Sequence, residues 1–205
     1  MVAAVGRHYT GTNFSYGICM LNIETIIDWL SRRAGGLYGG EPVTQLEHAL
    51  QCASRAQADG ATPSLVTAAL LHDLGHLSDT PDDARHPHEE LAASQLQPLF
   101  GAAVTEPIRL HVAAKRYLCV SDPAYWTNLS PMSKQSLEWQ GGAYTVAQAA
   151  SFIIQPHASD AVRLRQWDDA SKIPGQTTGS LPHFVAIMLG VARPQAELTL
   201  AGKRQ

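Results

Sequence analysis

The chain has 205 residues, of which 45% are hydrophobic, and a formal net charge of −3. A chain of this length and composition can bury a core without disulfides or structural metals, so we expect one domain over residues 1–205. Its 15 Lys and Arg residues are scattered, which argues against nucleic acid and anionic membranes as partners and favours a small molecule.

Apolar residues recur at spacings of three and four, and no segment alternates as a half-buried strand would. The pattern predicts an all-α fold. We expect the core over residues 22–192, with loosely held ends at 1–20 and 201–205. The predicted helices, in chain order, cover residues 23–33, 44–58, 64–74, 88–97, 105–117, 145–154, 159–171 and 182–189.

The three cysteines, Cys19, Cys52 and Cys119, are far apart and form no CxxC pair. This arrangement predicts neither a disulfide framework nor a thiolate zinc site and is typical of a reducing compartment. No apolar stretch approaches the roughly 20 residues that span a bilayer, and no secretion signal is evident. We therefore expect a cytoplasmic protein without membrane attachment.

The strongest motif is LLHDLGH at residues 70–76, where His72 and Asp73 follow each other near the end of a predicted helix. Neighbouring imidazole and carboxylate ligands can serve two metals, because the two oxygens of a carboxylate can bridge a metal pair. His48, in the preceding predicted helix, is a further candidate, although a lone histidine in such a helix is usually structural.

Three more candidate ligands follow in the chain: His88, His111 and Asp168. His86 is an alternative to His88. Asp169 is an alternative to Asp168, although a solvated or supporting carboxylate is the better interpretation of Asp169.

The resulting order of His, His-Asp, His, His and Asp resembles the HD superfamily of helical metal-dependent proteins over roughly residues 41–169. The resemblance implies an HD-domain helical bundle with two metals that share Asp73, and it favours His88 because two alanines follow at the superfamily's spacing. The implied ligands are His48, His72, Asp73 and Asp168 for one metal, and Asp73, His88 and His111 for the other.

The segment GLYGGE, residues 36–41, places Tyr38 in a glycine-flanked loop before the helix of His48. It resembles the substrate-responsive loop of HD-domain oxygenases that cleave 1-hydroxyphosphonates, relatives of the diiron inositol oxygenase. The resemblance implies that Tyr38 closes an open position on one iron until substrate arrives, and that Glu41 acts with it in gating the site.

Several anion-binding side chains lie one helical turn from the candidate ligands. His76 is four residues after His72, Lys115 four after His111, and Arg165 three before Asp168, so we expect each pair to share a helix face. Such groups suit a phosphonate, which an arginine can clasp bidentately. Ser133 matches the hydroxyl donor of the same family, with Ser136 as a competitor.

The resemblance implies a mixed-valent Fe(II)/Fe(III) pair and O₂-dependent cleavage of the carbon–phosphorus bond of (R)-1-hydroxy-2-aminoethylphosphonate or its N-trimethyl analogue. The products would be phosphate and glycine or glycine betaine. The sequence does not rank the two amines; possible wall residues are Glu41, Tyr117, Tyr125, Trp126 and Trp139.

Two other classes of function remain open at this stage: a phosphohydrolase of the same superfamily, which would use redox-inert metals, and a metal-stabilised binding module without catalysis. The oligomeric state is also open.

Overall fold

A computed structural model describes residues 21–78 and 87–194. The expectations for Cys19, His86, the first twenty residues and residues 201–205 lie outside these ranges. Within them the chain forms ten α-helices and two short helical turns, with no strand beyond an isolated bridge between Leu37 and Thr44. The all-α prediction is confirmed.

In chain order the elements are α1 (Ile23–Asp28), the π-helical turn η1 (Trp29–Arg33), α2 (Gln45–Ala58), α3 (Pro63–Leu71), the 3-10 turn η2 (Leu74–Leu77), α4 (His88–Leu96), α5 (Ala102–Ser121), α6 (Tyr125–Asn128), α7 (Pro131–Trp139), α8 (Val146–Ile153), α9 (Ala158–Ala170) and α10 (Leu181–Leu189).

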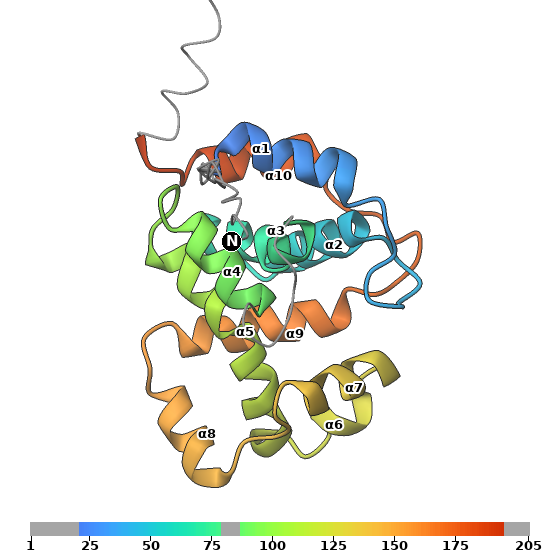
Figure 1. Ribbon diagram of the computed structural model, residues 1–205, viewed down its shortest axis with the longest axis vertical. Coiled ribbons are helices and arrows are strands. Elements are labelled where there is room, and N and C mark those ends of the chain that lie inside the picture. The colour runs from blue at the N-terminus through green and yellow to red at the C-terminus, as the bar shows by residue number, and fades with distance from the viewer. Residues whose placement is uncertain (1–20, 79–86, 195–205) are drawn as a thin grey trace, which may run out of the picture.

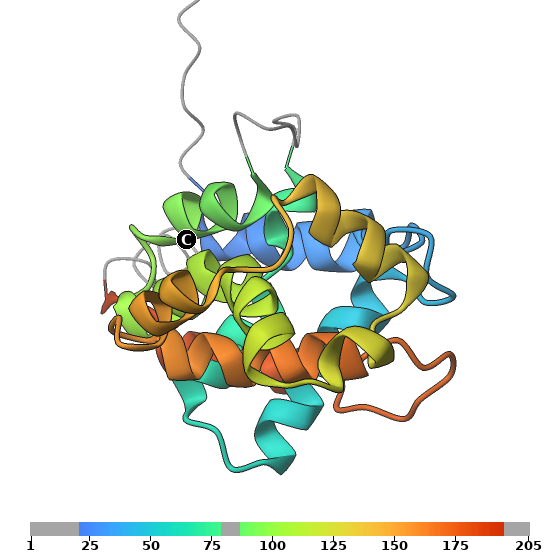
Figure 2. The same ribbon diagram turned by 90° about the horizontal axis from the view of Figure 1, so that it is seen from below.

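The helices are stacked in tiers (Figure 1). At one end α1 lies beside α10, with α2 and α3 in the next tier, and α6, α7 and α8 form the opposite end. The 20-residue helix α5 crosses the middle and packs against α9, α4 and α3. Seen from below, α5 in light green lies beside α9 in orange (Figure 2). This packing brings the elements that carry the predicted ligands around one centre.

The main core lies among α1, α2, α3, α5 and α10, where Ile26, Leu70, Ile108 and Phe184 are almost completely buried. Burying one such side chain contributes about 1.5–3 kcal/mol. A smaller cluster that includes Phe152 joins α5, α8 and α9. None of the described helices combines the length and the apolar character that a membrane span requires.

Side-chain caps fix the starts of several helices. Thr44 and Glu47 form a capping box at the start of α2, and Thr145 with Gln148 does the same for α8. Each box satisfies backbone N–H groups that have no partner within the helix. The predicted starts near these threonines are therefore confirmed.

Three predicted boundaries are wrong. The helix expected over 23–33 changes to a π-helical turn after Asp28, and the helix expected over 64–74 ends at Leu71. The helix expected over 105–117 is longer at both ends, and its N-terminal extension places Pro107 inside the helix.

Two helices, α6 and α7, were not predicted. α6 has only four residues, too few to show a period. α7 exposes most of its surface and buries only Ser133 and Leu137, so its apolar signal is weak. Its start did carry a signal, since Ser130 caps the helix and Pro131 occupies the first turn.

Candidate metal centre

The LLHDLGH motif forms the turn that separates two ligands. α3 ends at Leu71, His72 follows in helical conformation, and Asp73 leaves the helix with φ −101° and ψ 15°. The 3-10 turn then packs against the start of α4. A Cβ at Gly75 would lie 2.2 Å from the His88 carbonyl oxygen, so only glycine permits this approach. The motif thereby places Asp73 between His72 and His88.

The first group of candidate ligands joins α2, the end of α3, and α9. The Nε2 atoms of His48 and His72 are 3.2 Å apart. His48 Nε2 lies 3.4 Å from Asp168 Oδ1, and His72 Nε2 lies 3.4 Å from Asp73 Oδ2. His48, His72 and Asp168 are each at most 1% exposed.

The second group lies on the other side of Asp73 and joins α4 to α5. The Nε2 atoms of His88 and His111 are also 3.2 Å apart. Asp73 Oδ1 lies 3.4 Å from His88 Nε2 and 3.7 Å from His111 Nε2. One oxygen of Asp73 therefore faces each group, which is the arrangement that a bridging carboxylate needs.

The protonation of the histidines suits cations in both groups. The Nδ1 atoms of His48, His72 and His111 lie 2.7–3.0 Å from backbone carbonyl oxygens. Only a protonated Nδ1 can donate to a carbonyl, so in its neutral form each ring directs the lone pair of Nε2 into the centre. Facing lone pairs repel one another unless a cation lies between them, so the donor set fits metal ions.

The carboxylates lead to the same conclusion. Asp73 Oδ2 and Asp168 Oδ1 are buried and accept no hydrogen bond from the described residues. Such buried acceptors are costly unless an ion or water satisfies them. Donor atoms that share an ion at about 2.1 Å lie roughly 3–4 Å apart, which matches the separations observed here.

Burial and charge set the protonation of these ligands. Burial, with the neighbouring His88 and His72, lowers the pKa of His111 well below its usual value, so its ring is neutral. Burial would raise the pKa of Asp168, but the Arg165 guanidinium together with His48 and His72 outweighs it and holds this pKa well below the ordinary range. A neutral imidazole and an ionised carboxylate are the forms that bind metals.

Tyr38 lies against the first group. Its ring stacks on that of His48, with centroids 3.9 Å apart and planes 10° apart. Burial and the Asp168 charge raise the pKa of Tyr38 well above its ordinary value, so the phenol is neutral. Gly39 and Gly40 both have positive φ, which explains the glycines that follow Tyr38.

Glu41 lies at the same side of the site, but it does not contact the histidines. Its Oε1 accepts a 2.5 Å hydrogen bond from Ser130 and lies 3.4 Å from the Lys172 ammonium. The loop between Tyr38 and Glu41 is closed by a 2.7 Å bond from the Glu41 N–H to the Tyr38 carbonyl.

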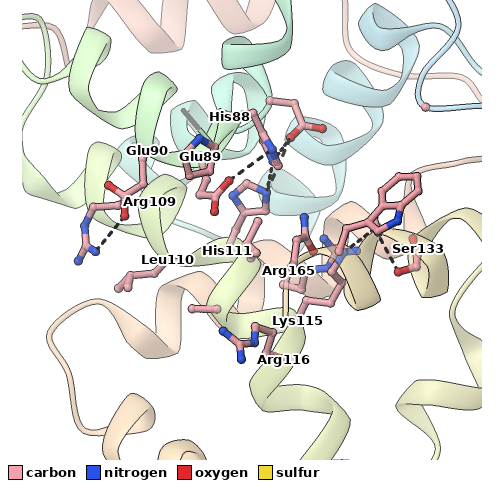
Figure 3. A pocket seen from close by; sticks show the side chains of 18 of the residues that line it. His88, Glu89, Glu90, Arg109, Leu110, His111, Lys115, Arg116, Ser133 and Arg165 are labelled. Carbon is pink, nitrogen blue, oxygen red and sulfur yellow. Dashed lines mark hydrogen bonds and ion pairs between the residues drawn. The ribbon is translucent and has the colours of Figure 1, made fainter. Parts of the chain in front are cut away.

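A cavity of about 1180 Å³ opens beside the second group. Figure 3 shows His88 and His111 facing each other, with Arg165, Lys115 and Ser133 together to one side of that pair. Lys115 Nζ donates to Ser136 Oγ, and Ser136 in turn donates to the Ser133 carbonyl. The hydroxyl hydrogen of Ser136 is thus already used, which favours Ser133 as the donor to a ligand.

Arg165 is held rigidly and also supports a candidate ligand. Its Nη1 lies 2.7 Å from Asp168 Oδ2, and its other nitrogens bond Asp169 and, at 3.2 Å, the Tyr125 hydroxyl. Asp169 therefore faces Arg165 and Tyr125. This geometry favours Asp168 over Asp169 as the ligand.

One sequence argument is wrong. His72 and His76 do not share a helix face, because α3 ends before His72 and His76 belongs to the 3-10 turn. His76 nevertheless reaches the centre: its ring stacks on that of His88 at 4.1 Å, and its Nε2 lies 3.9 Å from Asp73 Oδ1. Because Asp73, His76 and His88 offer donor atoms within 4.8 Å of one another, His76 is also placed as a possible metal donor.

Of the proposed amine-binding residues, Glu41 and Trp139 line the cavity. Tyr117 packs near Phe152, and the Tyr125 hydroxyl is taken by Asp169 at 2.5 Å. The Trp126 ring lies under the Lys134 ammonium. Neither Tyr117, Tyr125 nor Trp126 is a lining residue.

The sequence reasoning missed Lys172 and Glu89. Lys172, just beyond α9, lines the cavity and donates a 2.6 Å hydrogen bond to Ser133 Oγ. Glu89 Oε2 lies 3.3 Å from His88 Nδ1 and so orients that ring. Both are close in sequence to a candidate ligand, which is the signal that was available.

Cys52 lies on α2, one turn after His48, and its sulfur is within 4.8 Å of donor atoms of His48 and His72. Burial and the nearby Asp168 raise the pKa of its thiol well above the usual value. A buried thiol of this kind is not the thiolate that binds metals.

Comparison with known proteins identifies relatives of this chain. No protein-family model matches it. It is 48% identical over 157 residues to the hydroxymethylphosphonate dioxygenase of Gimesia maris, covering 73% of this chain and 78% of that protein. It is 36% identical over 184 residues to a 1-hydroxy-2-(trimethylamino)ethylphosphonate dioxygenase (glycine-betaine-forming) of Leisingera caerulea, covering 83% and 92%.

A third relative, an uncharacterized protein of Acanthamoeba polyphaga mimivirus, is 32% identical over 176 residues, covering 82% of this chain and 80% of that protein. The first two relatives carry the assignment, since each exceeds 30% identity over most of both chains. The chain belongs to the HD-domain phosphonate oxygenase family.

Proposed function

We propose that this protein is a diiron oxygenase that uses O₂ to cleave the carbon–phosphorus bond of a small 1-hydroxyphosphonate and releases phosphate. The observation that carries the proposal is Asp73, whose two oxygens face two separate histidine groups beside a cationic cavity. The dioxygenase relatives support the reaction class.

Six side chains would hold the metals, with nitrogen and carboxylate donors of the kind that non-heme iron takes. His48, His72 and Asp168 would complete one site and His88 and His111 the other, with Asp73 shared. When bound, the iron pair would supply the redox chemistry that uses O₂ to oxidise C1 of the substrate.

The cationic side chains of the cavity, Lys115 and Arg165, would bind the phosphonate group. Lys115 and Arg165 are 2% and 4% exposed, so their charges are poorly screened by water and would attract a dianion strongly. The hydroxyl of Ser133 accepts from Lys172, which leaves its own hydrogen to donate to a phosphonate oxygen. These contacts would hold C1 toward the metal centre and resist rotation of the substrate.

Tyr38, whose ring stacks on His48, would restrict access to the first group until substrate displaces it. The positive φ of Gly39 and Gly40 gives the loop a backbone that can adjust for this movement. His76 would contact the substrate from the opposite side, through the ring that stacks on His88.

The substrate carries a hydrogen, an aminomethyl or a trimethylaminomethyl group on C1. The first is the substrate in the name of the Gimesia maris relative, and the third is that of the Leisingera caerulea relative. With hydroxymethylphosphonate, one O₂ converts the substrate to formate and phosphate. The amine-bearing substrates would give glycine or glycine betaine and phosphate in the same way.

Metal analysis and EPR of protein from iron-rich culture would test the proposal. We expect about two irons per chain and a spin-½ signal from an antiferromagnetically coupled Fe(II)/Fe(III) pair. Phosphate release from esters with Mg²⁺, Mn²⁺ or Co²⁺ under anaerobic conditions would instead identify a phosphohydrolase.

A further inference from the structure

The ammonium of Lys172 occupies a position with three partners on the cavity wall. It donates to Ser133 Oγ at 2.6 Å, lies 3.4 Å from Glu41 Oε1, and stands 5.9 Å from the ring centroid of Tyr38. The side chains of Lys172 and Glu41 are each only 11% exposed. The pair is therefore largely shielded from solvent.

These partners are the ones that a substrate amine would use. An alkylammonium is recognised by a carboxylate, by hydroxyl acceptors and by an aromatic face. Lys172 already takes the carboxylate of Glu41 and approaches the ring of Tyr38, whose other contact is the stacked ring of His48. Glu41 Oε1 also accepts from Ser130, so it is doubly satisfied.

The other carboxylates of the cavity are engaged as well. Those in the described lining are Glu41, Asp73, Glu89 and Glu90. Asp73 faces the histidines, Glu89 lies 3.3 Å from His88 Nδ1, and Glu90 lies 3.7 Å from Arg109. Each carboxylate in the described lining of the cavity therefore already lies beside a basic side chain, with which an incoming cation would have to compete.

The aromatic side chains of the lining lead to the same conclusion. Besides Tyr38, they are Trp139, Tyr144 and Phe152. Arg116 covers Tyr144 at 4.4 Å, and Trp139 is 76% exposed. A quaternary ammonium needs several aromatic faces shielded from water, and this wall does not assemble them among the described residues.

We propose that Lys172 is a specificity-determining residue, a built-in ammonium on Glu41 that directs the site to 1-hydroxyphosphonates without a cationic substituent. This rests on the proposed function. The preferred substrate class is then hydroxymethylphosphonate, a dianion. A cavity of about 1180 Å³ has room for the larger substrates, so charge repulsion and not size excludes them.

The test compares hydroxymethylphosphonate, 1-hydroxy-2-aminoethylphosphonate and its N-trimethyl analogue as substrates of the iron-loaded enzyme. For the wild type we expect kcat/KM for hydroxymethylphosphonate to exceed the other values by on the order of 100-fold, because like charges would meet at Lys172. Lys172→Met keeps the length of the side chain without its charge. It should raise kcat/KM for the primary amine by at least about tenfold.

Two further variants identify the cause. Lys172→Arg keeps the positive charge and should keep the wild-type preference. The double variant Lys172→Met/Glu41→Gln should lose the gain for the amine, because the carboxylate that receives the ammonium is gone. Equal changes of all three substrates in Lys172→Met would overturn the proposal and make Lys172 a phosphonate-binding or structural residue.

Anaerobic calorimetry with the same three compounds separates this proposal from the proposed function. Wild-type protein should bind hydroxymethylphosphonate more tightly than either amine, whether or not turnover occurs. Absence of O₂-dependent turnover with that preference intact would contradict only the proposed function. Tighter binding of an amine by the wild type would overturn the role of Lys172, even if Lys172→Met fails to fold.

Discussion

The metal centre and the wall formed by α7 and Lys172 are built differently. In the centre, each of three imidazoles is fixed by a backbone carbonyl, so its Nε2 has one direction whatever the neighbouring side chains are. On the wall, Lys172, Ser133, Glu41 and Ser130 are held by one another. We therefore expect the centre to determine the class of reaction, and the wall to change its substrate through a single side chain.

The largest effect should come from Asp73. Asp73→Ala removes the carboxylate that faces both histidine groups, so both metals should be lost and activity should fall by on the order of a thousandfold or more. Iron analysis of the purified variant is the measurement. Asp160→Ala, a change at a half-exposed carboxylate on α9, is the control. Two irons per chain in Asp73→Ala would refute the shared-ligand role.

Arg165 connects the two regions, because it faces the cavity and also pairs with Asp168. Arg165→Ala should weaken phosphonate binding by on the order of 10-fold to 150-fold, as expected for loss of a charge-assisted contact. It should also reduce iron at the His48 group. Tyr125→Phe, which removes only a hydroxyl behind Arg165, should change binding much less. If Arg165→Ala leaves affinity intact, the guanidinium serves Asp168 alone.

The pH dependence should report Lys115. Burial and the adjacent Arg165 lower the pKa of Lys115 to about 7, although Asp168 and Asp169 oppose this. Below that pH the ammonium is charged and attracts the phosphonate; above it the charge is lost, so kcat/KM should fall as the pH rises through about 7. Lys115→Arg stays charged.

Ionisation of the phosphonate affects wild type and Lys115→Arg equally. Its effect therefore cancels when the kcat/KM of wild type is divided by that of Lys115→Arg. This ratio should decline above neutral pH. A ratio that stays constant from roughly pH 6 to roughly pH 9 would show that Lys115 does not titrate in this range.

Gly75→Ala should break the approach of the 3-10 turn to α4. The added Cβ would lie 2.2 Å from the His88 carbonyl oxygen, so α4 must shift. Overpacking of this kind costs about 1–3 kcal/mol, and the melting temperature should fall by roughly 2–8 °C. Gly35→Ala, where nothing lies within 4 Å, is the control. Equal melting temperatures for the two variants would contradict the close packing.

Tyr38→Phe should have the smallest effect on the resting protein. It removes the hydroxyl but keeps the ring on His48, so iron content and substrate affinity should be retained. Without substrate, its Fe(II) should oxidise in air several-fold faster, because access to the first group is less restricted. A stopped-flow spectrum with and without substrate is the measurement. Identical autoxidation of variant and parent would remove the gating role of Tyr38.

The proximity of the candidate ligands could be predicted from the sequence, because residue type alone limits what His72, Asp73 and their partners can do. Adjacent imidazole and carboxylate groups with further histidines downstream fit few other purposes, and α5 and α9 are regular enough to place Lys115 and Arg165 by helical spacing. The helical spacing used to place His76 was wrong, because α3 ends at Leu71 and His76 lies in the following 3-10 turn.

The wall was much less predictable. Its contacts join Glu41, Ser133 and Lys172, which are far apart in the chain and share no periodic pattern. α7 buries too little surface to show an amphipathic signal, so the orientation of Ser133 relative to Ser136 depended on tertiary packing. The engagement of Glu41 by Lys172 became visible only when both side chains were placed in space.

The most direct test of the central claim is the ratio of O₂ consumed to phosphate released by the iron-loaded protein with hydroxymethylphosphonate. An oxygenase built on this centre should consume about one O₂ per phosphate and stop when O₂ is removed. Phosphate release that continues at the same rate without O₂ would contradict the oxygenase account.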